Sequence, residues 1–201
     1  MLVEGNFDFT KNYVLEDERV ILSPATMPII EALKEYVNNE PEIWKYSLVG
    51  INNIDDFNGY FELAIEARKQ KTAYPFVVFD KQLNKYVGST RFYDIQLAFE
   101  TTQLGYTWYS KQVWGTKLNQ HCKYLLLQFA FDQMNLKRVE FRADNDNKRS
   151  IAAMKKIGCI EEGVLRSHLP RPDGSRRDSI VLSITKDDWD SNVKSLLYSQ
   201  L

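Results

Sequence analysis

The sequence predicts an α+β fold: a mixed, mostly antiparallel central sheet flanked by helices, with one strand-helix-strand unit. Two observations favour this class. Stretches that alternate apolar and polar residues are interleaved with stretches whose apolar residues recur at helical spacing. Successive strands in the middle of the chain are separated only by turns, until a whole helix intervenes before the next strand. We expect a single domain over residues 1–201, which is long enough for a sizeable core.

The first predicted elements are one strand and two helices. The stretch NYVLEDERVILSPAT alternates and stops at Ser23 and Pro24, so a helix is expected from about Pro24 to Asn38, with the proline in its first turn. The stretch DDFNGYFELAIEARKQ, residues 55–70, predicts a second helix with an apolar face and acidic residues at its start. A long loop over residues 38–52 joins the two helices.

The centre of the chain predicts three antiparallel strands and the strand-helix-strand unit. Residues 73–95 and 101–110 are rich in β-branched and aromatic residues, and their loop lengths are those of hairpins. Apolar residues then recur at helical spacing from Leu118 to Phe129, and LKRVEFRA at residues 136–143 alternates again. This helix therefore connects the third strand to a fourth.

Three elements complete the predicted fold. The stretch NKRSIAAMKKIG predicts a short helix over residues 147–158, which ends at Gly158, the residue type that favours a left-handed cap. Residues 159–184 read as a hairpin that turns at Gly174. A closing helix is expected at about residues 186–201.

Charge and hydropathy exclude several classes of protein. A formal charge of −1, from 26 basic and 27 acidic residues, provides no field that would gather nucleic acid or an anionic membrane. The first twenty residues are acidic where a signal peptide is basic. The longest apolar run, YLLLQFAF, is far shorter than the ~20 residues of a membrane span. A cytoplasmic protein without membrane or nucleic-acid partners is expected.

Cysteine and histidine usage indicates no metal site. Cys122 and Cys159 fall in a predicted helix and at the start of a buried strand, which is typical of reduced core thiols. His121 and His168 have no Cys or His nearby at the spacing of zinc ligands.

The stretch QVWGTKLNQH joins the third strand of the central group to the long helix. A glycine before a helix start would let a phosphate approach exposed backbone N–H groups, but the same pattern fits an ordinary turn. It is not a P-loop, because Thr116 separates Gly115 from Lys117 and position 110 is serine. The single glycine also excludes a dinucleotide fingerprint.

The chain from about Tyr86 to Trp189, including QVWGTKLNQH and NDNKRSIAAMKKIG, resembles the GNAT superfamily of acetyl-CoA-dependent N-acetyltransferases. It looks most like the Rim-type branch that acts on ribosomal proteins. The resemblance implies acetyl-CoA as co-substrate and direct attack by a primary amine in a ternary complex. The acceptor would be a protein N-terminus or a small amine. A non-catalytic module that binds CoA esters is the alternative.

The resemblance also implies where acetyl-CoA binds. The family's pyrophosphate loop has Gln or Arg, two residues, Gly, one residue, then Gly or Ala, so Gln112 and Gly115 match and Lys117 departs from the pattern. Backbone N–H groups near Trp108 or Tyr109 would meet the thioester carbonyl. The implied cofactor-binding residues are Trp108, Tyr109, Gln112, Val113, Trp114, Gly115, Thr116, Lys117 and Asn147.

Catalytic roles follow the same resemblance. Ser150, three residues after Asn147, is the candidate to hydrogen-bond or protonate the departing sulfur. Asn147 would contact the pantetheine arm, although its residue type equally suits a helix N-cap. Relatives have an acidic base where this chain has Gln103, so Asp94 and Glu100 are the substitutes, with solvated carboxylates as the other interpretation.

The acceptor amine is expected between the segments EIWKYS and STRFYDI, with an aromatic wall of Trp44, Tyr46, Phe92 and Tyr93. The basic hairpin turn RPDGSRRD is either a solvated turn or an attraction for an acidic peptide or ribosomal RNA. The sequence identifies neither the acceptor nor the oligomeric state, monomer or homodimer.

Overall fold

Eight strands form one sheet in the computed structural model of the chain, which describes residues 7–201. The sequence predicts that residues 1–20 are not a signal peptide, and the first six of these residues lie outside the described range. The strands are β1 (Leu15–Glu16), β2 (Val20–Pro24), β3 (Ala73–Asp80), β4 (Lys85–Gln96), β5 (Thr101–Tyr109), β6 (Arg138–Asp144), β7 (Ile160–Pro170) and β8 (Arg176–Thr185).

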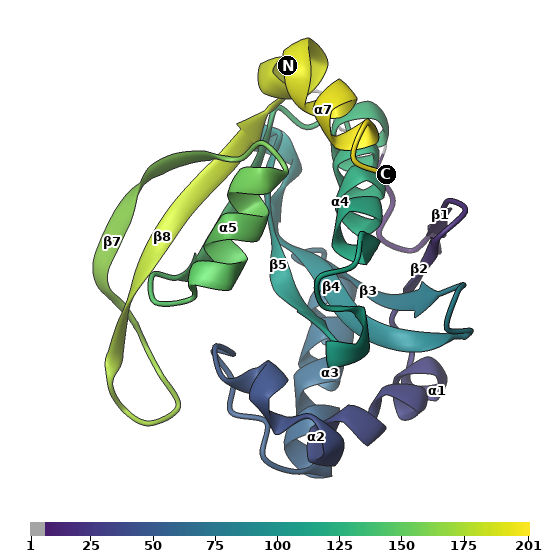
Figure 1. The fold of residues 1–201 in the computed structure, drawn as a ribbon, viewed down its shortest axis with the longest axis vertical. Helices are drawn as coiled ribbons and strands as arrows, with labels where there is room; N and C mark the ends of the chain where they lie inside the picture. The colour runs from purple at the N-terminus through teal and green to yellow at the C-terminus, as the bar shows by residue number, and fades with distance from the viewer. Residues whose placement is uncertain (1–6) are drawn as a thin grey trace.

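The strand order is β1-β2-β3-β4-β5-β6-β8-β7 (Figure 1). Within residues 7–201, β5 and β6 are the parallel pair and all other neighbours are antiparallel. The predicted α+β class and its strand-helix-strand unit, in which a helix connects β5 to β6, are therefore confirmed.

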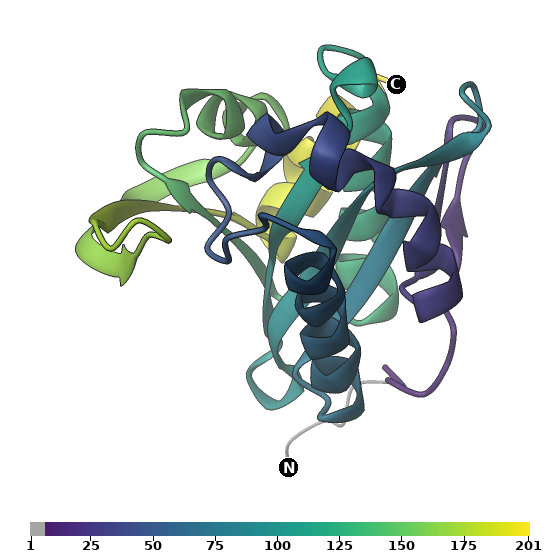
Figure 2. The same cartoon turned by 90° about the horizontal axis from the view of Figure 1, so that it is seen from below.

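Helices cover both faces of the sheet (Figures 1 and 2). One layer contains α4, α5 and α7, and the first part of the chain supplies the other. The helices are α1 (Met27–Ile30), α2 (Glu35–Asn39), α3 (Ile54–Lys69), α4 (Leu118–Gln128), α5 (Lys148–Lys156), α6 (Lys186–Asp188) and α7 (Lys194–Tyr198). Short 3-10 turns span Glu31–Leu33, Pro41–Trp44, Leu97–Phe99 and Lys111–Val113, and π-helical turns span Phe129–Gln133 and Trp189–Val193.

The continuous helix predicted over residues 24–38 is wrong. Pro24 is the last residue of β2, and the N–H of Ala25 donates to the carbonyl of Pro75. The helical segment therefore begins only after Thr26, and a 3-10 turn divides it into α1 and α2. The closing helix likewise contains a π-helical turn and ends at Tyr198 instead of residue 201.

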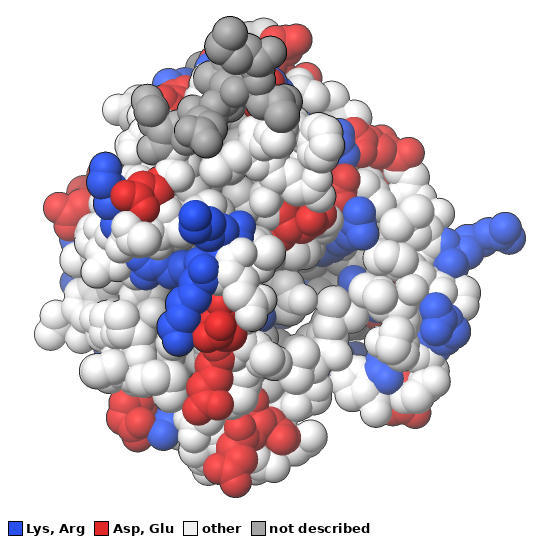
Figure 3. Space-filling model, turned by 180° about the vertical axis from the view of Figure 1, so that it is seen from behind, with Lys and Arg blue, Asp and Glu red and all other residues white. Residues whose placement is uncertain are grey.

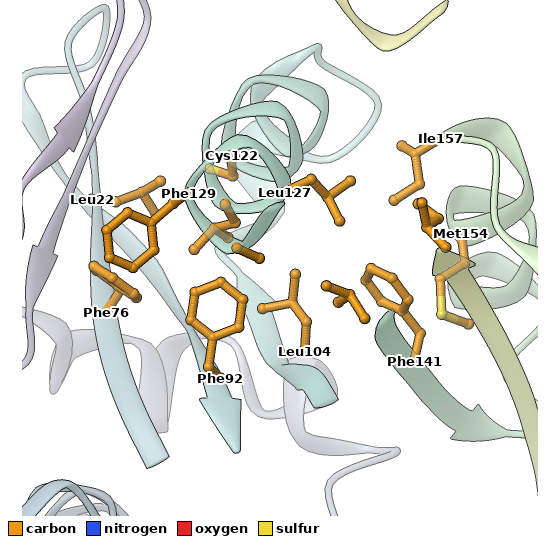
Figure 4. Packing of buried hydrophobic residues seen from close by; sticks show 14 of the residues in the cluster. Leu22, Phe76, Phe92, Leu104, Cys122, Leu127, Phe129, Phe141, Met154 and Ile157 are labelled. Carbon is orange, nitrogen blue, oxygen red and sulfur yellow. The ribbon is translucent and has the colours of Figure 1, made fainter. Parts of the chain in front are cut away.

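The larger of two apolar cores lies between the sheet and α4 (Figure 4). Phe92 is fully buried in this core, where its ring packs 6.3 Å from that of Phe129. This position contradicts the predicted place of Phe92 in the acceptor wall. The second core lies under α1, α2 and α3 on the opposite face.

The sheet separates in its centre. β5 pairs with β6 only from Thr101 to Gln103. Further along β5, the register with β4 shifts opposite Thr90, where Tyr106 has a φ of +50° and forms an irregularity of the β-bulge type. The rest of β5 therefore has β4 on one side and a gap toward β6 on the other. The N-terminal ends of α4 and α5 lie beside this gap.

Candidate active site

The gap between β5 and β6 opens into a cleft of about 610 Å³. Its walls come from β5, the loop before α4, one side of α5, the β6–α5 connection and the β7–β8 hairpin. Residues from the 3-10 turn Pro41–Trp44 and the loop after it close one end. The segments that the sequence assigned to cofactor and acceptor therefore meet in one place.

The loop before α4 presents backbone donors to the cleft. Gly115 is exposed with a φ of +74°, and a Cβ placed there would meet no protein atom within 4 Å. The N–H groups of Gly115, Lys117 and Asn119 have no acceptor within residues 7–201. Free N–H groups at a helix start favour anions, so this loop has the chemistry of a phosphate cradle.

Side chains outside the predicted set hold this loop in place. Glu40 accepts hydrogen bonds from the Ser110 hydroxyl at 2.9 Å and from the following backbone N–H at 2.7 Å. The indole N–H of Trp114 donates to the carbonyl of Tyr109 at 2.9 Å, and the Arg149 guanidinium lies 3.5 Å from the ring centroid. Sequence reasoning missed Glu40, because it lies seventy residues upstream of Ser110.

Three predicted cofactor residues have side chains that turn away from the cleft or serve the core. The Lys117 ammonium donates to the carbonyl of Leu201 at 2.8 Å, and Gln112 is exposed outside the cleft lining. Val113 is buried in the main core and accepts from the Thr116 hydroxyl at 2.7 Å. Of the three, only Lys117 has a backbone N–H without an acceptor in residues 7–201, because the N–H groups of Gln112 and Val113 donate to Ser110.

Asn147 and Ser150 lie on the side of α5 that faces the cleft. Asn147 is the N-cap, since its side-chain oxygen accepts from the Ser150 N–H at 3.1 Å. The capping interpretation is thus confirmed, yet the amide nitrogen of Asn147 has no acceptor in the described chain. The half-buried Ser150 hydroxyl also has no partner there and is available to a ligand.

The backbone of β5 offers a donor at the gap. Ser110 N–H donates to the carbonyl of Val87 at 2.7 Å, which is on the β4 side. Because successive backbone groups alternate sides along a strand, the N–H of Tyr109 faces the gap. Burial raises the pKa of the Tyr109 phenol well above its usual value, so this hydroxyl stays neutral.

Two predicted tryptophans are core residues. The Trp108 and Trp44 rings pack 4.7 Å apart, and both side chains belong to the second core. Trp44 is 7% exposed and also lines one end of the cleft, so its place in an acceptor wall stays a prediction. Neither indole N–H has a partner within residues 7–201.

Lys123 occupies the cleft from α4 and was not predicted. It is 5% exposed, and its ammonium donates to the Thr107 hydroxyl at 3.1 Å beside the bulge in β5. Burial lowers the pKa of Lys123 to about 8. No carboxylate of residues 7–201 lies within 4.0 Å of its ammonium.

Tyr46, Tyr93 and Asp94 line the cleft, and the contact of the two tyrosines with an acceptor stays a prediction. The Gln103 amide donates to the Asp94 carboxylate at 2.9 Å. Glu100, the other candidate base, lies outside the cleft lining. Of the two carboxylates, only Asp94 is therefore placed to receive a proton there.

The cysteines are as predicted, and His121 has two carboxylates nearby. Cys122 and Cys159 are free and buried. His121 Nδ1 lies 2.7 Å from the Asp17 carboxylate, and with Glu18 these ligand atoms lie within 4.8 Å of one another. Neither neighbour is a Cys or His, and pairing with Asp17 suffices to satisfy a buried histidine.

Within residues 7–201, no helix combines the length and the apolar character of a membrane span.

Comparison with known proteins agrees with the geometry. The family profile described as Acetyltransferase (GNAT) domain matches residues 19–160. The N-acetyltransferase p20 of Bacillus licheniformis, described as uncharacterized, is 21% identical over 176 residues, which are 87% of this chain and 97% of that protein.

Two solved structures share the fold. A GCN5-related N-acetyltransferase from Brucella melitensis superposes with a TM-score of 0.85 at 20% identity, over 96% of this chain and 86% of that chain. RimJ of Mycobacterium smegmatis, solved in complex with CoA-disulfide, has a TM-score of 0.78 at 18% identity, over 94% and 93% of the two chains.

Proposed function

This chain belongs to the acetyltransferase (GNAT) domain family, and we propose that it moves the acetyl group of acetyl-CoA to a primary amine by direct attack within the β5–β6 cleft. The observation that carries this proposal is the juxtaposition at one gap. Gly115 and Asn119 with their free N–H groups, Tyr109 and Ser150 with its unpartnered hydroxyl all line the same cleft. RimJ, whose fold is similar, binds a CoA derivative.

The cofactor end is assigned to the α4 and α5 side. The N–H groups of Gly115, Lys117 and Asn119 would receive the pyrophosphate, since they lie at the positive end of a helix. The amide of Asn147 would bind the pantetheine arm. The arm then extends along the unpaired edge of β5 toward the bulge.

The chemistry needs a polarised carbonyl and a stabilised leaving group. The Tyr109 N–H donates to the thioester oxygen, where negative charge develops as the amine nitrogen attacks the carbonyl carbon. The carbon–nitrogen bond forms, the carbon–sulfur bond breaks, and the Ser150 hydroxyl donates to the departing thiolate. Positioning of the two substrates supplies a further part of the acceleration.

Asp94 is proposed to take the proton of the attacking amine, directly or through a water molecule. Asp94→Asn should lower kcat/KM about tenfold, because asparagine still accepts from Gln103 but cannot accept the proton. Steady-state kinetics of Asp94→Asn and of Glu100→Gln, the control outside the cleft, test this assignment. Equal losses in the two variants would contradict the assignment.

The seat of the pyrophosphate is tested by Gly115→Val. The new side chain would project into the space that the phosphates need, so acetyl-CoA binding should weaken at least about tenfold, or ~1.4 kcal/mol, in calorimetry. Gly174→Val is the matched control, because Gly174 also has a positive φ, +83°, and also has open space around its Cβ position, but lies at the hairpin tip. Unchanged affinity in Gly115→Val, or an equal loss in both variants, would place the cradle elsewhere.

A further inference from the structure

The three arginines of the stretch RPDGSRRD, residues 171–178, have different surroundings. Arg171 forms ion pairs with Asp144 at 2.8 Å and Asp146 at 2.8 Å. Arg176 is exposed, and its guanidinium donates to the backbone carbonyl and hydroxyl of Ser167. Only Arg177 lines the cleft.

Arg177 is a buried cation without a protein anion. It is 6% exposed, and within residues 7–201 no carboxylate lies within 4.0 Å of its guanidinium. Its Nε–H donates to the hydroxyl of Ser179 at 3.0 Å, while the two terminal nitrogens have no acceptor in the same residue range. A guanidinium stays charged in proteins, and burial of such a charge without a partner is unfavourable.

His168 contacts the same serine hydroxyl as Arg177. His168 Nδ1 lies 3.0 Å from the hydroxyl oxygen of Ser179, which already accepts from Arg177. The hydroxyl can donate its proton to His168 Nδ1 while its oxygen accepts from Arg177, and we assign this arrangement, which places the histidine proton on Nε2. Burial and the charges of Arg142 and Arg177 lower the pKa of His168, which keeps the ring neutral at pH 7. Its Nε2–H is an additional donor at the cleft wall.

The other charges of the cleft do not neutralise Arg177. Asp144 is held by Arg171 on two nitrogens, and Arg142 is paired with Glu140 at 2.7 Å. Asp94 is bound by the amide of Gln103 on β5. Figure 3 shows this face hollowed beside the β7–β8 hairpin, with separate Lys and Arg side chains on the hairpin side.

We infer that Arg177 and His168 form a carboxylate-binding subsite for the acceptor, so that the preferred substrate is an amine that also carries a carboxylate. The guanidinium donates two parallel hydrogen bonds to the two carboxylate oxygens, and His168 Nε2–H donates a third hydrogen bond. This inference rests on the proposed transfer to an amine and adds the substrate class. Rejection of neutral acceptors follows, because they would leave the buried guanidinium unpaired.

The test compares acceptors that differ only in the acid. Peptides with the N-terminal sequence Ser-Glu and Ser-Gln are paired, as are β-alanine and propylamine, and kcat/KM is measured with acetyl-CoA. The unmodified protein should prefer the acidic member of at least one pair by about tenfold or more. Arg177→Gln should remove that preference by raising the KM of the acidic acceptor, whereas Arg176→Gln, the neighbouring control, should retain it.

The outcomes separate this inference from the proposed function. Equal rates for acidic and neutral acceptors, or an unchanged preference in Arg177→Gln, would overturn the subsite while acetyl transfer stands. A stronger preference for phosphoethanolamine than for either carboxylate would replace carboxylate by phosphate and also overturn the inference as stated. If no amine is acetylated, calorimetry with the two peptides and acetyl-CoA decides: Arg177-dependent binding of the acidic peptide supports the subsite, and its absence refutes it. Acetyl-CoA affinity like that of the unmodified protein shows that Arg177→Gln is folded.

Discussion

Ser150→Ala should lower kcat for acetyl transfer by roughly ten- to a thousandfold, the range for single proton donors and oxyanion donors, with little change in acetyl-CoA affinity. The Ser150 hydroxyl faces the cleft from the first turn of α5 and has no partner within residues 7–201. It would act on a charge that exists only as the thiolate departs, so its removal affects turnover and not ground-state binding. Steady-state kinetics and calorimetry measure the two quantities.

The kinetics of Ser150→Ala separate three roles. A lower kcat at constant affinity supports the donor role, while weaker binding at constant kcat would assign Ser150 to holding the cofactor. No change in kcat or in affinity would mean that Ser150 serves only as a residue of the first turn of α5. Ser195→Ala on α7 removes an exposed serine hydroxyl far from the cleft and should behave as the unmodified protein.

Lys123→Met should stabilise the ligand-free protein at pH 7, and this gain should decline as the pH rises. Burial lowers the pKa of Lys123 from 10.5 to about 8. Between these values the unfolded chain holds more protons than the folded one, so the stability of the unmodified protein increases with pH. The difference in free energy of unfolding between Lys123→Met and the unmodified protein should therefore shrink by about 3 kcal/mol from pH 7 to above pH 10.

Denaturant unfolding at several pH values measures this difference. The exposed Lys148 of α5 lies outside the cleft lining, so Lys148→Met is the matched control for loss of a lysine at the surface. A pH-independent difference for Lys123→Met would mean that the ammonium is paired or solvated, contrary to its surroundings in the cleft.

Rules about single residue types predicted an element correctly where the local sequence alone decides its ends. The end of α5 was expected at Gly158, which has a φ of +97°, and a Cβ there would lie 2.9 Å from the Val193 side chain. Only glycine suits both conditions. The predicted helix over residues 24–38 failed because pairing of Pro24 with β3 overrode the local preference for a proline in the first turn.

The candidate site was predicted where residues near in sequence form it. Gly115 and the pair Asn147 and Ser150 lie at helix starts, which the sequence indicates. Lys123 was not predicted, and Arg177 was expected in a basic turn that is either solvated or attracts an acidic peptide or ribosomal RNA. Polar positions on a helix or hairpin normally face water. Only the separation of β5 from β6, which depends on distant strands, turns these positions toward a ligand.

Aromatic side chains gave the least reliable predictions. Phe92 and Tyr93 are adjacent on β4, so their side chains point to opposite faces of the sheet. One enters the main core, and the other lines the cleft. Residue type does not distinguish these outcomes, since apolar rings suit both environments.

The most direct test of acetyl transfer to an amine is an assay of the unmodified protein with acetyl-CoA and a panel of amines, with mass spectrometry of the products and release of free thiol as readouts. The panel includes peptides with free N-termini, polyamines and amino acids. We expect thiol release that depends on an amine, matched by one acetylated product per thiol. Tight binding of acetyl-CoA with no acetylated product from any amine would contradict the proposal and indicate a module that only holds CoA esters.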